Sequence, residues 1–113
     1  MNFADYSKEA MRFCSDISGL ELGSKDARVI LSLLGLNGEV GELTDIYKKK
    51  YFHGHEVDQD SIKKEIGDVM WYMVLLCETL DIDMDEVMQK NIDKLQKRYD
   101  GPLTAEKSIN RVE

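Results

Sequence analysis

Two pairs of acidic residues are the part of this sequence best suited to chemistry. Glu39 and Glu42 form one pair, Glu65 and Asp68 form the other, and each pair is spaced three residues apart. Residues three apart lie on one face of an α-helix. The pairs are also symmetric about the basic segment 48–55, which reads as a turn. Two antiparallel helices joined there would bring Glu39 near Asp68 and Glu42 near Glu65.

Four carboxylates at close range cannot all stay ionised without a counter-charge. They either point apart into water or hold a hard divalent cation. Mg²⁺ prefers oxygen ligands and commonly bridges to the phosphates of a substrate. A single E-x-x-E pair is usually only solvated helix surface. Here the metal site is favoured, because Glu65 and Asp68 interrupt a nearly apolar helix and charges in such places are rarely left unpaired.

The elements that must position these carboxylates are helices. Apolar residues recur at helical spacing in four stretches, which predict helices over about 3–18, 25–55, 58–80 and 83–99. The residues suited to cap them are Asn2, Asp83 and one of Asp58, Asp60 or Ser61. No stretch shows strand-like alternation. The sequence therefore predicts an all-α, four-helix-type bundle, with a domain over residues 1–102 and a C-terminal arm over 103–113.

Three glycines lie in the second predicted helix, at Gly35, Gly38 and Gly41. Each costs about 1 kcal/mol relative to alanine in a helix interior. Bare backbone at these positions admits a close partner, which is either a facing helix or a ligand.

Length, charge and cysteine content narrow the class of protein. A chain of 113 residues is expected to form one domain, and its net charge of −7 disfavours binding to nucleic acid or to an anionic membrane. Cys14 and Cys77 make no disulfide framework. The longest apolar run, Val69 to Cys77, is too short to cross a bilayer, and the N-terminal residues lack the features of a signal peptide. These features predict a cytoplasmic protein.

Three motifs together resemble the MazG-like nucleotide pyrophosphohydrolases of the all-α NTP pyrophosphatase superfamily. They are the E-x-x-E at Glu39–Glu42, the segment Glu65–Tyr72 that begins with E-x-x-D, and the segment Asn91–Tyr99. The resemblance covers roughly Leu33 to Gly101, with a further match at Ser108–Arg111. Phosphoribosyl-ATP pyrophosphohydrolases and all-α dUTPases share this fold, so the resemblance leaves the substrate open.

The resemblance implies Mg²⁺-dependent hydrolysis of a nucleoside triphosphate to the monophosphate and pyrophosphate. Glu42, Glu65 and Asp68 would hold the metal. Glu39 would orient the attacking water as the base, with a possible further role as ligand to a second metal. The resemblance does not fix which of the four carboxylates is the base and which are metal ligands, because such carboxylates titrate as a coupled set.

The resemblance also implies which residues contact the substrate. Asn91 and Lys94 would contact its phosphates or sugar. Arg98 shares their helix face and contacts either substrate or an acidic neighbour. Tyr72, four residues after Asp68, either stacks on the base, bonds to the sugar or belongs to the core.

The third predicted helix is apolar on nearly every face from Ile66 to Leu80. A four-helix monomer of this size cannot cover a whole helix circumference, so the pattern predicts a homodimer or homotetramer. A function of a different class also fits. The chain would then be a non-enzymatic helical oligomer, whose acidic cluster binds metal for stability or docks a basic partner.

Overall fold

A computed structural model of the chain describes residues 1–14, 23–99, 101–102 and 104–110. Every regular element in those ranges is helical, which confirms the predicted all-α class. By its contacts the chain divides into two compact units, Met1–Asp81 and Ile82–Glu113. Within the described ranges no helix combines the length and apolarity needed to cross a bilayer. The elements are α1 (Phe3–Ala10), η1 (Met11–Phe13), α2 (Ser24–His53), α3 (Gln59–Thr79), α4 (Met84–Arg98) and α5 (Ala105–Ile109).

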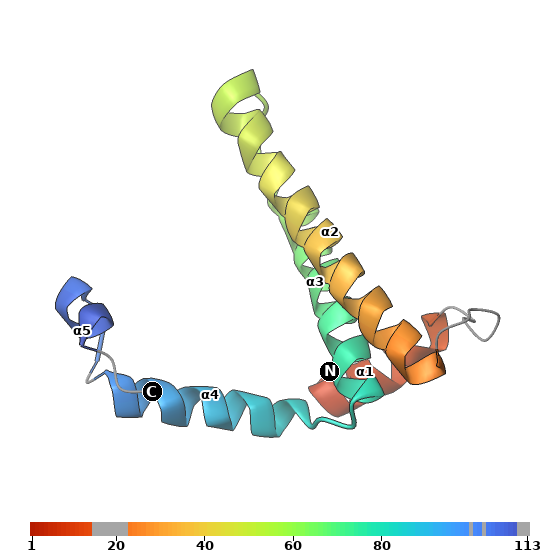
Figure 1. Cartoon of the computed structure of the whole chain (residues 1–113). Coiled ribbons are helices and arrows are strands. Elements are labelled where there is room, and N and C mark those ends of the chain that lie inside the picture. Colours follow the sequence, from red (N-terminus) through yellow and green to blue (C-terminus); the bar gives the residue numbers. More distant parts are fainter. Residues whose placement is uncertain (15–22, 100, 103, 111–113) are drawn as a thin grey trace. The chain divides into compact units, whose positions relative to one another are not determined.

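The first unit is built on a hairpin of two long helices, α2 and α3, which lie side by side (Figure 1). Helix α2 ends at Gly54, whose φ of 69° lies in the left-handed region that favours glycine. The side chain of Asp58 then caps α3 by accepting a hydrogen bond from the Asp60 amide at 3.1 Å. The turn is shorter than predicted: we expected residues 48–55 to form it, but α2 continues to His53. The hairpin nevertheless brings Glu39 of α2 to Glu65 and Asp68 of α3.

The glycines of α2 are not equivalent. A Cβ atom added to Gly35 would meet the ring of Tyr72 on α3 at under 3.0 Å, so this glycine lets the two helices approach. A Cβ added to Gly38 or Gly41 would meet nothing within 4 Å. Of these three glycines, only Gly35 is required by packing between helices in the described part of the chain.

Helix α1 packs against α3 through two side-chain hydrogen bonds. The indole Nε1 of Trp71 donates to the carbonyl of Ala10 at 3.0 Å, and the hydroxyl of Ser7 donates to the carboxylate of Glu78. The side chain of Asn2 caps α1 as predicted, accepting from the Asp5 amide at 2.9 Å.

The first helix is shorter than predicted. We expected it to reach Ser18, which lies outside the described residues, but the α-helix ends at Ala10 and continues only as the 3₁₀ turn η1. The amide of Cys14 donates to the carbonyl of Met11 at 3.2 Å. At this end of α1 the carbonyl of Ala10 accepts its hydrogen bond from Trp71 of α3, so a side chain of another helix satisfies it.

The hairpin buries few side chains completely. Those buried in the described ranges are Ala10, Ala27, Ser32, Val74 and Leu75. Large apolar side chains remain exposed on both helices, including Leu34 at 69% and Ile66 at 51%. Helix α3 is therefore only partly covered by its own chain, in line with its apolar circumference.

The second unit contains α4 and α5. Helix α4 begins where predicted, with Asp83 accepting from the Asp85 amide at 3.1 Å, and it ends at Arg98. Gly101 follows with a φ of 93°. Helix α5 lies within the segment 103–113 that was predicted to be an arm. The domain boundary between residues 102 and 103 stays a prediction.

Candidate metal centre

Three carboxylates from the two hairpin helices converge. Glu39 comes from α2, and Glu65 and Asp68 come from adjacent turns of α3. Each offers one carboxylate oxygen, and these three oxygens all lie within 4.8 Å of one another. The arrangement brings together three of the four residues that the sequence predicted as metal ligands.

The electrostatics of the cluster reflect this crowding. The pKa of Glu39 is raised above its ordinary value of 4.5, first by partial burial and then by the charge of Asp68. A hydrogen bond with Glu65 and the charges of Glu65 and Glu42 act in the same direction. Each effect disfavours the ionised form of the Glu39 carboxylate. A positive charge beside the three carboxylates would favour the ionised form again.

One oxygen of the cluster is left without a partner. The Oε2 atom of Glu65 is buried and accepts no hydrogen bond within the described part of the chain. A buried oxygen of this kind is costly unless a hydrogen-bond donor or a cation interacts with it. Three converging carboxylate oxygens, with a buried and unsatisfied oxygen on one of the same residues, are a donor set that suits a divalent cation such as Mg²⁺. The residues present therefore fit the metal that the sequence analysis expects.

Glu42 lies one helical turn beyond Glu39 on α2 and is exposed. Its carboxylate is not one of the three that lie within 4.8 Å of one another. Its charge nevertheless acts on Glu39. The role of Glu42 as a metal ligand stays a prediction.

Tyr72, a predicted substrate contact, is half-buried and lies against Gly35. Its ring meets the ring of Trp71 edge-on, with centroids 5.0 Å apart and an interplanar angle of 89°. Part of the Tyr72 ring thus serves helix packing, which was one of the alternatives that the sequence left open. Its contact with substrate stays a prediction.

Sequence reasoning missed Tyr6. Burial and the charge of Asp68 both raise the pKa of the Tyr6 hydroxyl, so this side chain of α1 reaches the electrostatic field of the cluster. In the sequence Tyr6 is one of several apolar positions of a first helix. Nothing in its spacing points to Asp68, because this electrostatic interaction depends on how α1 packs on α3.

The second unit carries the other predicted substrate contacts. Asn91, Lys94 and Arg98 all lie on α4, with the spacing that places them on one helix face. Asn91 and Lys94 are exposed. Arg98 is half-buried and lines a polar hollow with residues of the C-terminal segment, namely Thr104, Glu106, Lys107 and Asn110.

Comparison with known proteins decides the family. Residues 30–101 match the family described as the MazG nucleotide pyrophosphohydrolase domain, which is more than half of the chain. The chain belongs to this family. It is also 37% identical over 82 residues to the Gene 37 protein of Mycobacterium phage L5, a stretch that covers 69% of this chain and 72% of the phage protein. No solved structure matches the chain.

The MazG match places the carboxylate cluster inside the family domain. Glu39, Glu65 and Asp68 all fall within residues 30–101, as does most of the hairpin. Helix α1 and Tyr6 precede the matched range. The cluster of this chain therefore lies within the matched domain, whereas α1 lies outside it.

Proposed function

We propose that the chain is a Mg²⁺-dependent nucleoside triphosphate pyrophosphohydrolase, which releases a nucleoside monophosphate and pyrophosphate. The single observation that carries the proposal is the convergence of Glu39, Glu65 and Asp68, with one buried Glu65 oxygen unsatisfied. Membership of the MazG family supports the general activity. The proposal places the enzyme in the cytoplasm and assigns it to the cleaning or control of nucleotide pools.

In this proposal Glu65 and Asp68 hold Mg²⁺ from α3, and Glu42 completes the set from α2. Bound there, Mg²⁺ would neutralise phosphate charge and supply Lewis-acid polarisation. The chain is strongly acidic, so a triphosphate would otherwise be repelled from this face.

Glu39 is proposed to orient the attacking water. Glu39 comes from α2, whereas Glu65 and Asp68 come from α3, and one carboxylate oxygen of Glu39 lies within 4.8 Å of an oxygen of each. A carboxylate held in this position can accept a proton from a water that lies within hydrogen-bond reach. Asn91, Lys94 and Arg98 are proposed to bind phosphates or sugar, and Tyr72 to contact the base or sugar. Charge-assisted hydrogen bonds of this kind position a polyanion.

We also propose that the enzyme is a homodimer or homotetramer. The support is the exposed apolar surface of the hairpin, whose members on α2 include Ile30, Leu33, Leu34, Val40, Tyr47, Tyr51 and Phe52. Exposed apolar surface of this extent commonly marks an interface.

Pyrophosphate release from a panel of ribo- and deoxyribonucleoside triphosphates, with Mg²⁺ and with EDTA, tests the proposed activity. We expect turnover of at least one nucleotide, dependent on Mg²⁺ and lost in Asp68→Asn. A matched control is Asp60→Asn, because Asp60 is an exposed carboxylate of the same helix that pairs with Lys64 at 3.3 Å. The control is expected to keep full turnover.

The same experiment addresses the rival function. If no triphosphate is turned over while Mg²⁺ still raises the melting temperature, the chain is a metal-stabilised helical oligomer and the enzymatic proposal fails. Release of inorganic phosphate in place of pyrophosphate would contradict the proposed reaction.

A further inference from the structure

The hollow at the end of α4 is built from charged and polar side chains. It has a volume of about 500 Å³, within the range of roughly 300–1,000 Å³ that small-molecule sites occupy. Its lining residues are Arg98 from α4 and, from the C-terminal segment, Thr104, Glu106, Lys107 and Asn110. All of them belong to the second compact unit, so the hollow is formed within that unit.

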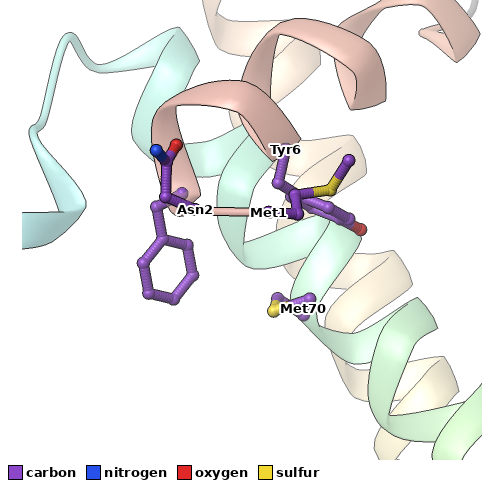
Figure 2. A pocket seen from close by; sticks show the side chains of 5 residues that line it. Met1, Asn2, Tyr6 and Met70 are labelled. Atoms are coloured by element: carbon purple, nitrogen blue, oxygen red, sulfur yellow. The ribbon is translucent and has the colours of Figure 1, made fainter.

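A different hollow, between the N-terminal residues and α3, has a lining of another kind. Figure 2 shows Met1, Asn2, Tyr6 and Met70 around it, and Phe3 also lines it. The side chain of Asn2 already caps α1. No charged side chain of the described residues lines this hollow, so its lining does not select a charged ligand. By contrast, the lining at the end of α4 specifies the charge of a ligand.

Two cationic side chains line the hollow at the end of α4, and both are half-buried. Along α4 only the first and last residues, Met84 and Arg98, are half-buried. Within α5 only Lys107 is half-buried, whereas Ile109 is 81% exposed. The short helix therefore turns its lysine, and not its isoleucine, toward the hollow. This burial is unusual, because arginine and lysine are mostly exposed in proteins.

Local hydrogen bonds hold Lys107 in this place. The hydroxyl of Thr104 caps α5 by accepting a hydrogen bond from the Lys107 amide at 3.1 Å. The Lys107 ammonium donates to the carbonyl of Pro102 at 3.3 Å. Both bonds tie Lys107 to the residues that precede α5.

The lining has a net positive charge, although the chain as a whole has a net charge of −7. Arg98 and Lys107 each carry a positive charge, and Glu106 carries the single negative charge among the lining residues. Two like charges at one hollow repel each other, and an anion between them would offset that repulsion. Guanidinium and ammonium groups bind phosphate oxygens through charge-assisted hydrogen bonds. The lining therefore favours a phosphate-bearing anion.

We propose that the hollow at the end of α4 binds a phosphate-bearing anion, held by Arg98 and Lys107. The amide of Asn110 and the hydroxyl of Thr104 supply further donors. The site goes beyond the proposed function, because binding there needs neither a metal ion nor turnover, and Lys107 has no role in that reaction. The anion is either the phosphate chain of a nucleotide or free pyrophosphate, which share this chemistry.

Titration with inorganic pyrophosphate in EDTA is the direct test. Without Mg²⁺ the carboxylate cluster repels an anion, so binding must come from cationic side chains. Backbone amide NMR on the full chain shows where the anion binds. We expect the amide signals of Arg98, Lys107 and Asn110 to shift, while those of the lysine run 48–50 at the end of α2 stay in place. The absence of a shift at the hollow, or equal shifts at both places, overturns the proposal.

Removal of one positive charge from the hollow is the second test. Lys107→Gln is expected to weaken pyrophosphate binding about tenfold, since a hydrogen bond to a charged group contributes roughly that much. Lys97→Gln is the matched control, because Lys97 is an exposed neighbour of Arg98 that does not line the hollow. The control should bind pyrophosphate as the wild type does. Equal weakening by both substitutions would mean that the anion responds only to overall charge, and the proposed site would be wrong.

Nucleoside triphosphates added in EDTA identify the source of the phosphate. If a triphosphate shifts the same amide signals and binds more tightly than pyrophosphate, the hollow takes the phosphate chain of the nucleotide. If pyrophosphate binds as tightly or more tightly, the hollow takes the free anion. Should the amide spectrum of Lys107→Gln show that α5 is lost, the titration of the wild-type chain decides alone.

Failure of this inference is distinguishable from failure of the proposed function. If triphosphates are hydrolysed with Mg²⁺ but pyrophosphate does not bind in EDTA, only the anion site is wrong. If pyrophosphate binds at the hollow while no triphosphate is hydrolysed, the anion site stands and the proposed reaction is wrong.

Discussion

Gly35 on α2 lies against the ring of Tyr72 on α3, with no room between them for a Cβ atom. Gly35 precedes Glu39 by four residues and Tyr72 follows Asp68 by four, so both pairs are symmetric about the same turn. One helical turn separates the packing contact from the carboxylate contact. The close approach at Gly35 therefore helps to hold Glu39 opposite Asp68.

Gly35→Ala is expected to destabilise the chain. The added methyl group would overlap the Tyr72 ring, and overpacking of this kind typically costs about 1–3 kcal/mol. Gly38→Ala is the matched control on the same helix. It meets nothing within 4 Å and should stabilise the fold by up to about 1 kcal/mol. Urea unfolding of the two variants measures the difference, and equal stabilisation by both would show that the Tyr72 contact is absent.

Gly38→Ala also tests the ligand explanation for the glycines. If substrate approaches the bare backbone beside Glu39, this variant should gain stability and lose turnover. If turnover is unchanged, no ligand needs the space at Gly38.

Glu39→Gln is expected to stabilise the metal-free chain near neutral pH. The pKa of Glu39 in the folded chain is raised above 4.5, so the folded state holds this proton more tightly than the unfolded chain. The stability that protonated Glu39 contributes is fully present below pH 4.5, and it is lost as the pH rises through the pKa that Glu39 has in the folded chain. Thermal unfolding in EDTA at about pH 4 and about pH 7.5 should show a gain for Glu39→Gln only at the higher pH. Glu56→Gln, at an exposed loop carboxylate, serves as the control.

Glu42→Gln is expected to abolish Mg²⁺-dependent turnover, as Asp68→Asn does. The prediction requires the exposed Glu42 side chain to reach a metal that Glu39, Glu65 and Asp68 hold close by. Kinetics across a range of Mg²⁺ concentrations gives the test. If Glu42→Gln keeps its turnover at the Mg²⁺ concentration that suffices for the wild type, the metal site consists of three carboxylates. Glu42 then acts on that site only through its charge.

Lys94→Ala is expected to raise KM about tenfold, because one charge-assisted hydrogen bond to phosphate contributes roughly that much. Stability should change little, since Lys94 is exposed. Lys90→Ala is the control, because Lys90 sits one turn earlier on α4 and pairs with Glu86 at 3.1 Å. If KM and kcat are the same in Lys94→Ala as in the wild type, Lys94 belongs to the solvated face of the helix.

Leu34→Lys is expected to shift the protein toward monomers. The side chain is 69% exposed on a helix that carries several other exposed apolar residues, and a lysine there would oppose burial at an interface. Light scattering at micromolar concentration should give at least a dimer for the wild type and for the control Ser24→Lys. A wild-type mass of 13.0 kDa that persists on concentration would exclude the proposed oligomer.

Local chemistry explains which features could be predicted from the sequence. Asn2 and Asp83 cap their helices as expected, and Asp58 is the one of three candidates that caps α3, because an N-cap depends on residues only two or three positions away. The symmetric spacing of the acidic pairs predicted a register that places Glu39 with Asp68, as the structure has it. The same spacing predicted Glu42 near Glu65, but Glu42 is not among the carboxylates that converge.

Features that depend on packing between helices escaped prediction. The first α-helix ends at Ala10, whose carbonyl accepts a hydrogen bond from Trp71, sixty-one positions along the chain. The approach of Tyr6 to Asp68 has the same origin in the docking of α1 on α3. Sequence spacing alone also could not separate Gly35, which meets Tyr72, from Gly38, which meets nothing.

The carboxylate cluster is assembled from one uninterrupted stretch of chain, Glu39 to Asp68, on consecutive helices. The entropy lost in closing a short loop is small, and contacts between neighbouring elements form quickly in folding. We therefore expect the carboxylates to meet as soon as the hairpin forms, before α1 docks. A metal ion bound at that stage would favour the hairpin over the open chain, so the ion would act as a template for folding as well as a cofactor.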